Sequence, residues 1–197
     1  MFSADSRAYE RVSDDLMAEI PQGTVVSRAF VLDTARHFSI ARRYFAAMAR
    51  PDRWISWKFA GIREGMRLIE KYKLDVIWST SPIATAHVIA TELHRRTGLP
   101  WIADFRDPMV QVEYPADPVT RRLLYKIEAK VVDNAVLSLF TTPGTAYTCR
   151  QRYSDRAGHV QVLENGYDEE SFSGLVSSAS QTEPLNPELE RRCARPW

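Results

Sequence analysis

The fold is constrained most by residues 75–108, which read as an apolar strand, a helix with clear ends and a second apolar strand. Ser81 and Pro82 supply a plausible N-cap and first helical residue, and Gly98 ends the helix before the next strand begins at Trp101. A strand, a helix and a strand in this order form a parallel pair joined by a right-handed crossover. The sequence therefore predicts an α/β protein.

The alternation of strands and helices continues along the chain. We expect further strands at 25–31, 136–140 and 159–163, and further helices at 54–72, from Pro118 onward and from Pro143 to about Tyr153. This order predicts a Rossmann-like, doubly wound parallel sheet. We expect one domain over residues 1–172 and a poorly ordered tail over 173–197, where Ser, Gly, Thr and Pro become frequent.

The helix at 54–72 illustrates the packing that the pattern predicts. Its apolar residues recur at spacings of three and four, which places them on one face. The expected inner face consists of Ile55, Phe59, Ile62, Met66 and Ile69.

Composition removes several classes of protein. The net charge of +1 gives no global attraction to nucleic acid or membranes, and no apolar run is long enough to span a bilayer. Cys149 and Cys193 lie far apart and outside any CxxC motif, which argues against a disulfide scaffold or cysteine-ligated zinc and suits a reducing cytoplasm. His87 and His94 share a helix without a third ligand, so we expect polar contacts there, no metal and no cofactor.

Polar side chains gather where two neighbouring strands end. Ser79, Thr80 and Ser81 follow the first strand, and the second ends in Asp104-Phe105-Arg106-Asp107. The carboxyl ends of parallel strands form the ligand-binding edge of such a sheet, and an arginine fork suits a phosphate or carboxylate. The alternatives are an internal ion pair between Arg106 and Asp107 and a plain helix cap at Ser81.

The segment 36–59 mixes six Arg or Lys residues with aromatic residues and only one acid. Such a surface suits the headgroup region of an anionic membrane. We expect Arg42, Arg43, Tyr44 and Trp54 to contribute to an outer patch, with Phe59 in the core. The alternative is that Trp54, Trp57 and Phe59 are simply core residues of the helix at 54–72. No nucleic-acid recognition motif accompanies the patch, so we expect no nucleic-acid partner.

Three segments together resemble the N-terminal domain of the glycosyltransferase family 4-like enzymes, which have the two-domain GT-B fold. They are the DVIWSTSP segment at 75–82, the WIADFRDP segment at 101–108 and the ENGYD segment at 164–168 with Phe172. The resemblance covers about residues 5–173. It implies a retaining enzyme that transfers a sugar from a nucleotide-sugar donor to an acceptor glycan or a lipid-linked sugar.

The resemblance also implies roles for individual residues. Asp104, Arg106, Asp107 and the Ser79–Ser81 segment would bind the acceptor, and Asn165 and Gly166 would form the hinge between domains. The protein would work in the cytoplasm, peripheral to the inner face of the membrane. The donor would bind only if a second domain were supplied.

The family's opening strand, glycine turn and helix have no counterpart in this chain, and neither does its donor-binding domain. We therefore expect the chain alone to be inactive, and the catalytic residues are unknown. The alternative function is a non-catalytic module that binds a membrane surface or a partner chain. In a doubly wound sheet the first strand is central, so without it two facing edges would lack partners, and we expect marginal stability or self-association.

Overall fold

The computed structural model describes residues 1–9, 20–37 and 46–166. The chain divides into two units, Met1–Glu164 and Asn165–Trp197, and the elements below all belong to the first. Its strands are β1 (Phe2–Ala4), β2 (Ser27–Ala29), β3 (Ile77–Thr80), β4 (Trp101–Arg106), β5 (Leu137–Phe140) and β6 (Val160–Val162). Its helices are α1 (Thr34–His37), α2 (Trp57–Tyr72), α3 (Ala84–Thr97), α4 (Pro118–Asn134) and α5 (Pro143–Arg152). Short 3₁₀ turns cover Ser6–Ala8, Ala46–Ala49 and Ser154–His159.

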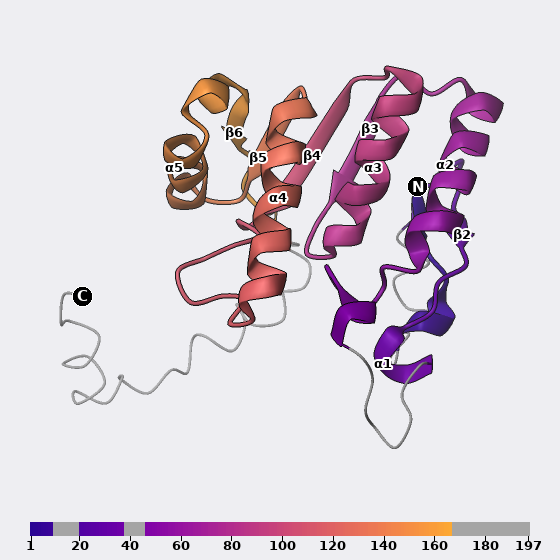
Figure 1. Ribbon diagram of the computed structural model, residues 1–197. Coiled ribbons are helices and arrows are strands. Elements are labelled where there is room, and N and C mark those ends of the chain that lie inside the picture. Colours follow the sequence, from indigo (N-terminus) through magenta and orange to yellow (C-terminus); the bar gives the residue numbers. More distant parts are fainter. Residues whose placement is uncertain (10–19, 38–45, 167–197) are drawn as a thin grey trace, which may run out of the picture. The chain divides into compact units, whose positions relative to one another are not determined.

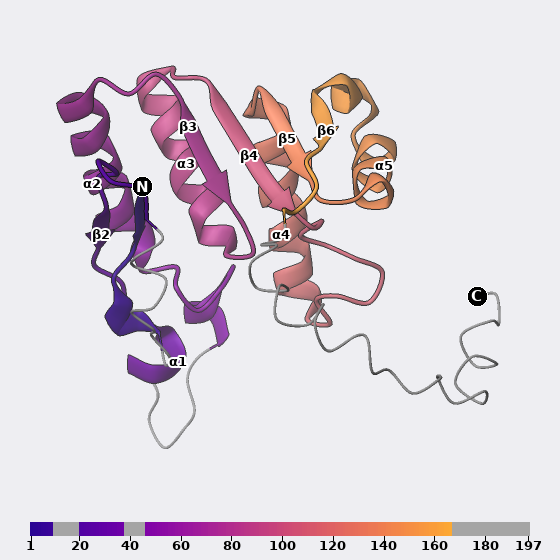
Figure 2. The same cartoon turned by 180° about the vertical axis from the view of Figure 1, so that it is seen from behind.

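The described strands form two parallel sheets. One has the order β1-β2 and the other the order β3-β4-β5-β6 (Figure 1). β1 lies between β2 and the edge of the larger sheet, and all strands run in the same direction (Figure 2). The prediction of an α/β protein with a Rossmann-like parallel sheet flanked by helices is confirmed.

Helices α2, α3 and α4 lie side by side over one face of the strands (Figures 1 and 2). Two of the expected helix ends are confirmed in detail. The Asp117 carboxylate accepts a hydrogen bond from the Thr120 amide at 2.9 Å, with Pro118 as the first helical residue of α4. Gly98 ends α3 in the left-handed conformation that glycine tolerates best, with φ of 71°.

The core lies between α3, α4 and the larger sheet. In β4 the side chains of Trp101, Ala103 and Phe105 are fully buried, as alternation along a strand requires. Phe105 stacks on Phe140 of β5, with ring centroids 5.1 Å apart. Both rings belong to the core that the strands share with α3 and α4, and they lie near the carboxyl ends of β4 and β5.

The expected inner face of α2 is wrong at Phe59 and confirmed at Ile62, which is buried, and at Met66 and Ile69, which pack partly buried against the core. Phe59 is 78% exposed, whereas Trp57, Gly61, Ile62, Gly65 and Leu68 are buried. A Cβ added to Gly61 would lie 2.6 Å from Ile89 Cδ1, and one added to Gly65 would lie 2.6 Å from Leu93 Cδ1. The two glycines therefore form the surface on which α3 packs, and a pattern of apolar side chains alone does not reveal such a surface.

Candidate functional site

The candidate site lies at the carboxyl ends of β3 and β4. Thr80 stands opposite Asp104 in the parallel register, and its hydroxyl donates a hydrogen bond of 2.8 Å to Asp104 Oδ2. The Nε atom of Arg106 lies 3.8 Å from the same oxygen. The Asp104 side chain is 15% exposed and that of Arg106 is 54% exposed. The carboxylate is thus held in place while most of the guanidinium faces solvent.

The backbone of Arg106 is unusual for its residue type. Its φ of 55° lies in the left-handed region, and the pairing of β4 with β5 shifts register between Asp104 and Arg106. The amide and hydroxyl of Thr141 both donate to the Arg106 carbonyl at 2.9 Å, which fixes this conformation. Bulges of this kind redirect a side chain at a strand end, and glycine is the residue that adopts the left-handed region most easily.

Ser79 lies beneath the site rather than in it. The Trp101 indole donates to Ser79 Oγ at 2.8 Å, and Ser79 Oγ lies 2.7 Å from His87 Nδ1. Since the indole can only donate, the serine hydroxyl is free to donate to His87. Burial lowers the pKa of His87 to about 3, so its imidazole is neutral. We assign this trio to support of the strand ends.

Ser81 does not cap α3 as expected. Its hydroxyl donates to the Phe105 carbonyl, and the helix begins at Ala84 with Ile83 in the cap position. The N-terminus of α3 instead receives the Asp52 carboxylate, which accepts hydrogen bonds from the Thr85 amide at 2.7 Å and from the Thr85 hydroxyl at 2.9 Å. An anion from the protein itself therefore occupies the helix end that the sequence offered to a ligand.

The remaining predicted site residues are dispersed. Asp107 is exposed beside Arg106, and no ion pair joins the two side chains among the described residues, so the internal Arg106–Asp107 pair is absent there. Asn165 and Gly166 are exposed residues at the start of the second unit, and their hinge role stays a prediction.

The membrane patch expected from 36–59 is only partly described. Arg42, Arg43 and Tyr44 lie outside the described residues, and Trp54 is half-buried against the core. Two basic residues near Trp54 are engaged within the fold. Arg53 pairs with the buried Asp33 and lies over the Trp54 ring, and Arg50 pairs with Asp117 at 3.0 Å.

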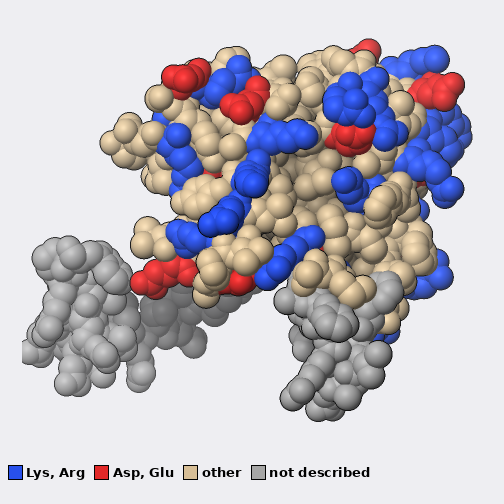
Figure 3. All heavy atoms as spheres, in the orientation of Figure 1, with Lys and Arg blue, Asp and Glu red and all other residues tan. Residues whose placement is uncertain are grey.

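A basic hollow on α4 is a second candidate that the sequence reasoning missed. Lys and Arg atoms form a continuous stripe over α4 in Figure 3. The hollow has a volume of about 530 Å³ and is lined by Arg121, Arg122, Lys126, Arg152, Tyr125 and Tyr153, among others. The guanidinium of Arg152 lies 4.9 Å from the centre of the Tyr125 ring. Basic residues at positions 122, 126 and 130, four apart on a helix, were the available signal.

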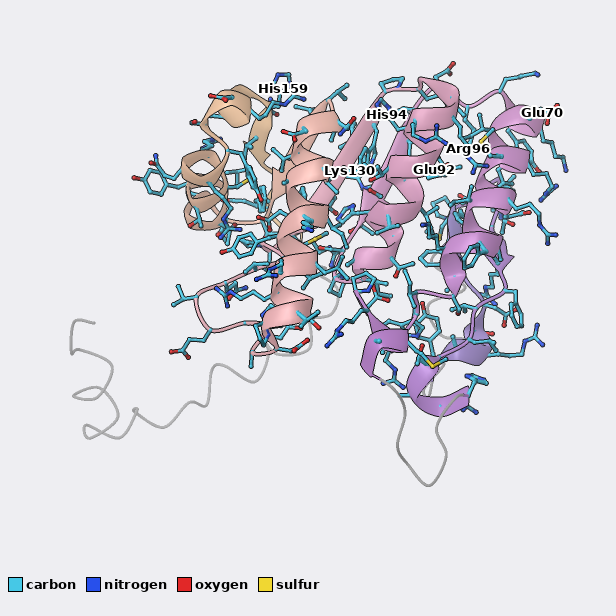
Figure 4. The ribbon with its side chains drawn as sticks, in the orientation of Figure 1. Glu70, Glu92, His94, Arg96, Lys130 and His159 are labelled. Atoms are coloured by element: carbon cyan, nitrogen blue, oxygen red, sulfur yellow. The ribbon has the colours of Figure 1, made fainter. Side chains whose placement is uncertain are left out.

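Charged residues also gather at the opposite edge of the sheet, where the strands begin. Figure 4 labels several of them, including Glu92, His94 and Arg96 on the last turns of α3. Glu92 pairs with Arg95 at 2.7 Å and with Arg96 at 2.6 Å, and His94 Nδ1 lies 2.7 Å from the Leu99 carbonyl oxygen. Glu92 thus pairs with two arginines and His94 bonds to the backbone, so we place no site there.

Neither a metal site nor a membrane-spanning helix is found in the part of the chain that the structure describes. No group of three His, Cys, Asp or Glu side chains there could hold a metal ion, and no helix there is long and apolar enough to cross a membrane. Burial raises the pKa of the Cys149 thiol to about 12, so this cysteine is a poor nucleophile.

Comparisons with protein-family models and with curated proteins find no match to this chain.

Proposed function

We propose that this domain is the acceptor-binding half of a GT-B glycosyltransferase. The observation that carries the proposal is the left-handed backbone of Arg106, which presents a largely exposed guanidinium next to Asp104 and Thr80 at the ligand edge of the sheet. Residues kept in costly backbone conformations concentrate at functional sites. The three family-like segments, at 75–82, 101–108 and 164–168, supply the chemical class.

The residues at this edge suit an acceptor that carries both hydroxyls and an anionic group. The Arg106 guanidinium would bind a phosphate or carboxylate through two parallel hydrogen bonds, and the carboxylates of Asp104 and Asp107 would accept hydrogen bonds from sugar hydroxyls. The nucleotide-sugar donor would bind to a second domain, and transfer would retain the configuration of the sugar. The complete enzyme would act in the cytoplasm.

Replacing Arg106 with glycine tests whether the arginine serves binding or the fold. Arg106→Gly should raise the free energy of unfolding by about 1 kcal/mol, because glycine adopts a φ of 55° without steric cost. It should also weaken binding of a hexose 1-phosphate by about tenfold or more, because charge-assisted hydrogen bonds contribute about 1.5–3 kcal/mol. Urea titration and isothermal calorimetry measure the two effects.

The matched control is Arg63→Gln on the exposed face of α2, which removes the same charge away from the site and should leave both quantities unchanged. Undiminished binding of the hexose 1-phosphate by Arg106→Gly would contradict the proposal.

A second candidate is contact with an anionic membrane, as in a non-catalytic module, and the basic hollow on α4 favours it. Each cation near such a surface contributes about 1 kcal/mol, so Arg122→Gln with Lys126→Gln should weaken binding to phosphatidylserine vesicles about tenfold or more. Arg42→Gln with Arg43→Gln serves as the comparison. If only this second pair reduces co-sedimentation, the contact belongs to the segment at 36–59 instead.

A further inference from the structure

A deep groove separates the two sheets. Its volume is about 770 Å³, and its two walls are β1, from Phe2 to Ala4, and β3, from Ile77 to Thr80. Inner residues of α2 and α3, among them Leu68, Ile89 and Leu93, form its floor. The groove therefore lies where one more strand would join β1-β2 to β3-β4-β5-β6.

The backbone of each wall offers unused hydrogen-bonding groups to this groove. In β1 the groups that bond to β2 belong to odd-numbered residues, as in the bonds from Ser27 to Met1 and from Asp5 to Ala29. The N–H and C=O groups of Phe2 and Ala4 consequently point the other way, because successive residues of a strand alternate. No described strand pairs with this edge.

The same alternation holds in β3. Ile77 and Ser81 donate to β4 and its preceding loop, at the carbonyls of Pro100 and Asp104. Trp78 and Thr80 therefore direct their backbone groups toward the groove, and among the described strands none pairs with this edge either. Both walls thus present parallel edges that run in the same direction.

The volume of the groove is close to that of one strand. Five residues of extended chain occupy about 17 Å, with strands about 4.8 Å apart and sheet layers about 10 Å thick, which gives roughly 800 Å³. Among the described residues, no Asp, Glu, Lys or Arg side chain lines the groove. An occupant must therefore be extended, able to form hydrogen bonds on both edges, and apolar.

We propose that this groove receives a single apolar β-strand from a partner polypeptide, inserted parallel to β1 and β3. The inserted strand would bond to Phe2 and Ala4 on one side and to Trp78 and Thr80 on the other, and would cover the apolar floor. It would convert the two sheets into one continuous sheet. This inference rests on the geometry of the groove, to which Thr80 contributes its backbone, whereas the proposed acceptor site uses the Thr80 side chain.

Neither a second copy nor the chain's own tail fits as well. The described strands of a second copy are already paired in sheets with helices over one face. The sequence of residues 167–197 has no apolar run longer than the pair Leu175-Val176 and contains three prolines. An inserted strand needs an alternating or continuous apolar run without proline.

The test uses the full chain and a synthetic nine-residue peptide with five central valine and isoleucine residues flanked by lysines. Saturable binding should slow hydrogen exchange of the amides of Phe2, Ala4, Trp78 and Thr80 by about tenfold or more, with no comparable change in β6. The matched control peptide carries a central proline, which removes a backbone donor. It should give no protection.

A variant tests the floor of the groove. Ala86→Glu would place a carboxylate against the bound strand and should abolish protection, whereas Ala129→Glu on α4 should not. Circular dichroism confirms that each variant is folded. Equal effects of both peptides, or protection away from β1 and β3, would overturn the proposal. Protection that appears without peptide and grows with protein concentration would assign the groove to a second copy and would also overturn it.

Discussion

Two buried or partly buried aspartates, Asp33 and Asp52, have pKa shifts of opposite sign. Burial opposes ionisation of Asp33, but hydrogen bonds from Arg53 and from the amides of Ala35 and Arg36 hold its pKa below its usual value. Burial also opposes ionisation of Asp52 and there raises the pKa, because the donors that reach the carboxylate, chiefly those of Thr85, are neutral. Ionisation of Asp52, which caps α3, therefore lowers the free energy of unfolding.

This raised pKa predicts an unusual dependence of stability on pH. Above the unfolded value of 3.8, the folded chain retains a proton on Asp52 that the unfolded chain has lost. The contribution of Asp52 to the free energy of unfolding is therefore greatest below pH 3.8 and falls as pH rises through the folded pKa. An asparagine side chain at this position would not titrate, so the stability of the parent relative to Asp52→Asn should decrease over this interval.

Urea titrations at a series of pH values measure the difference between the parent and Asp52→Asn. Asp117 supplies a control of opposite sign: hydrogen bonds from Thr120 lower its pKa to about 2, so the stability of the parent relative to Asp117→Asn should rise with pH between about 2 and 3.8. A difference that grew as pH rose would show that ionisation of Asp52 stabilises the folded protein, contrary to the prediction.

At the scale of elements, the contact between α2 and α3 depends on two glycines. Gly65→Ala should lower the free energy of unfolding by about 1–3 kcal/mol, because the new methyl group would lie 2.6 Å from Leu93 Cδ1 in a packed contact. Gly144→Ala in α5 is the matched control. No atom lies within 4 Å of the added Cβ there, so alanine should raise stability by up to about 1 kcal/mol. A neutral effect of Gly65→Ala would mean that the two helices can move apart freely.

Helix ends could be predicted from the sequence wherever the residues at the end themselves determine it. Asp117, Pro118 and Gly98 mark helix ends through their own backbone preferences, and the structure places α3 and α4 accordingly. The apolar pattern predicted Ile62, Met66 and Ile69 on the packed face of α2, but not the part of that face formed by Gly61 and Gly65, because glycine contributes no hydrophobic signal.

In the candidate site, too, some features could be predicted from the sequence and others could not. Thr80 and Asp104 were brought together by strand order, which the sequence predicts. The cap of α3 comes from Asp52, which is distant along the chain, and such tertiary contacts leave no local pattern. The left-handed backbone of Arg106 depends on its register with β5, and therefore could not be predicted from residues 101–108 alone.

At the scale of the whole described domain, two sheets are joined mainly through helices. A two-stranded sheet is marginally stable by itself, and β1-β2 depends on its packing against α2. The helices beside the larger sheet are joined by a buried ionic contact, in which Glu128 of α4 accepts hydrogen bonds from Arg152 of α5 and from Tyr153, the latter at 3.0 Å. We infer that the two sheets unfold locally in separate steps.

Hydrogen exchange under native conditions tests this separation. The amides that join β1 to β2 should exchange at a lower free energy of opening than those of β4 and β5. Gly65→Ala should accelerate exchange chiefly in β1 and β2, because it weakens the α2–α3 contact that supports them. Arg152→Met should act chiefly on β4, β5 and β6, because it leaves the buried Glu128 carboxylate without its cation at a cost of about 3–5 kcal/mol.

The two variants serve as controls for each other, since Gly65 and Leu93 lie at the floor of the groove between β1 and β3, whereas Arg152 and Glu128 do not line it. If both accelerated exchange equally in both sheets, the domain would unfold as one cooperative unit. The strand-binding peptide should then abolish the difference between the variants, because a strand bonded to both edges would make the opening of either sheet break hydrogen bonds to the other.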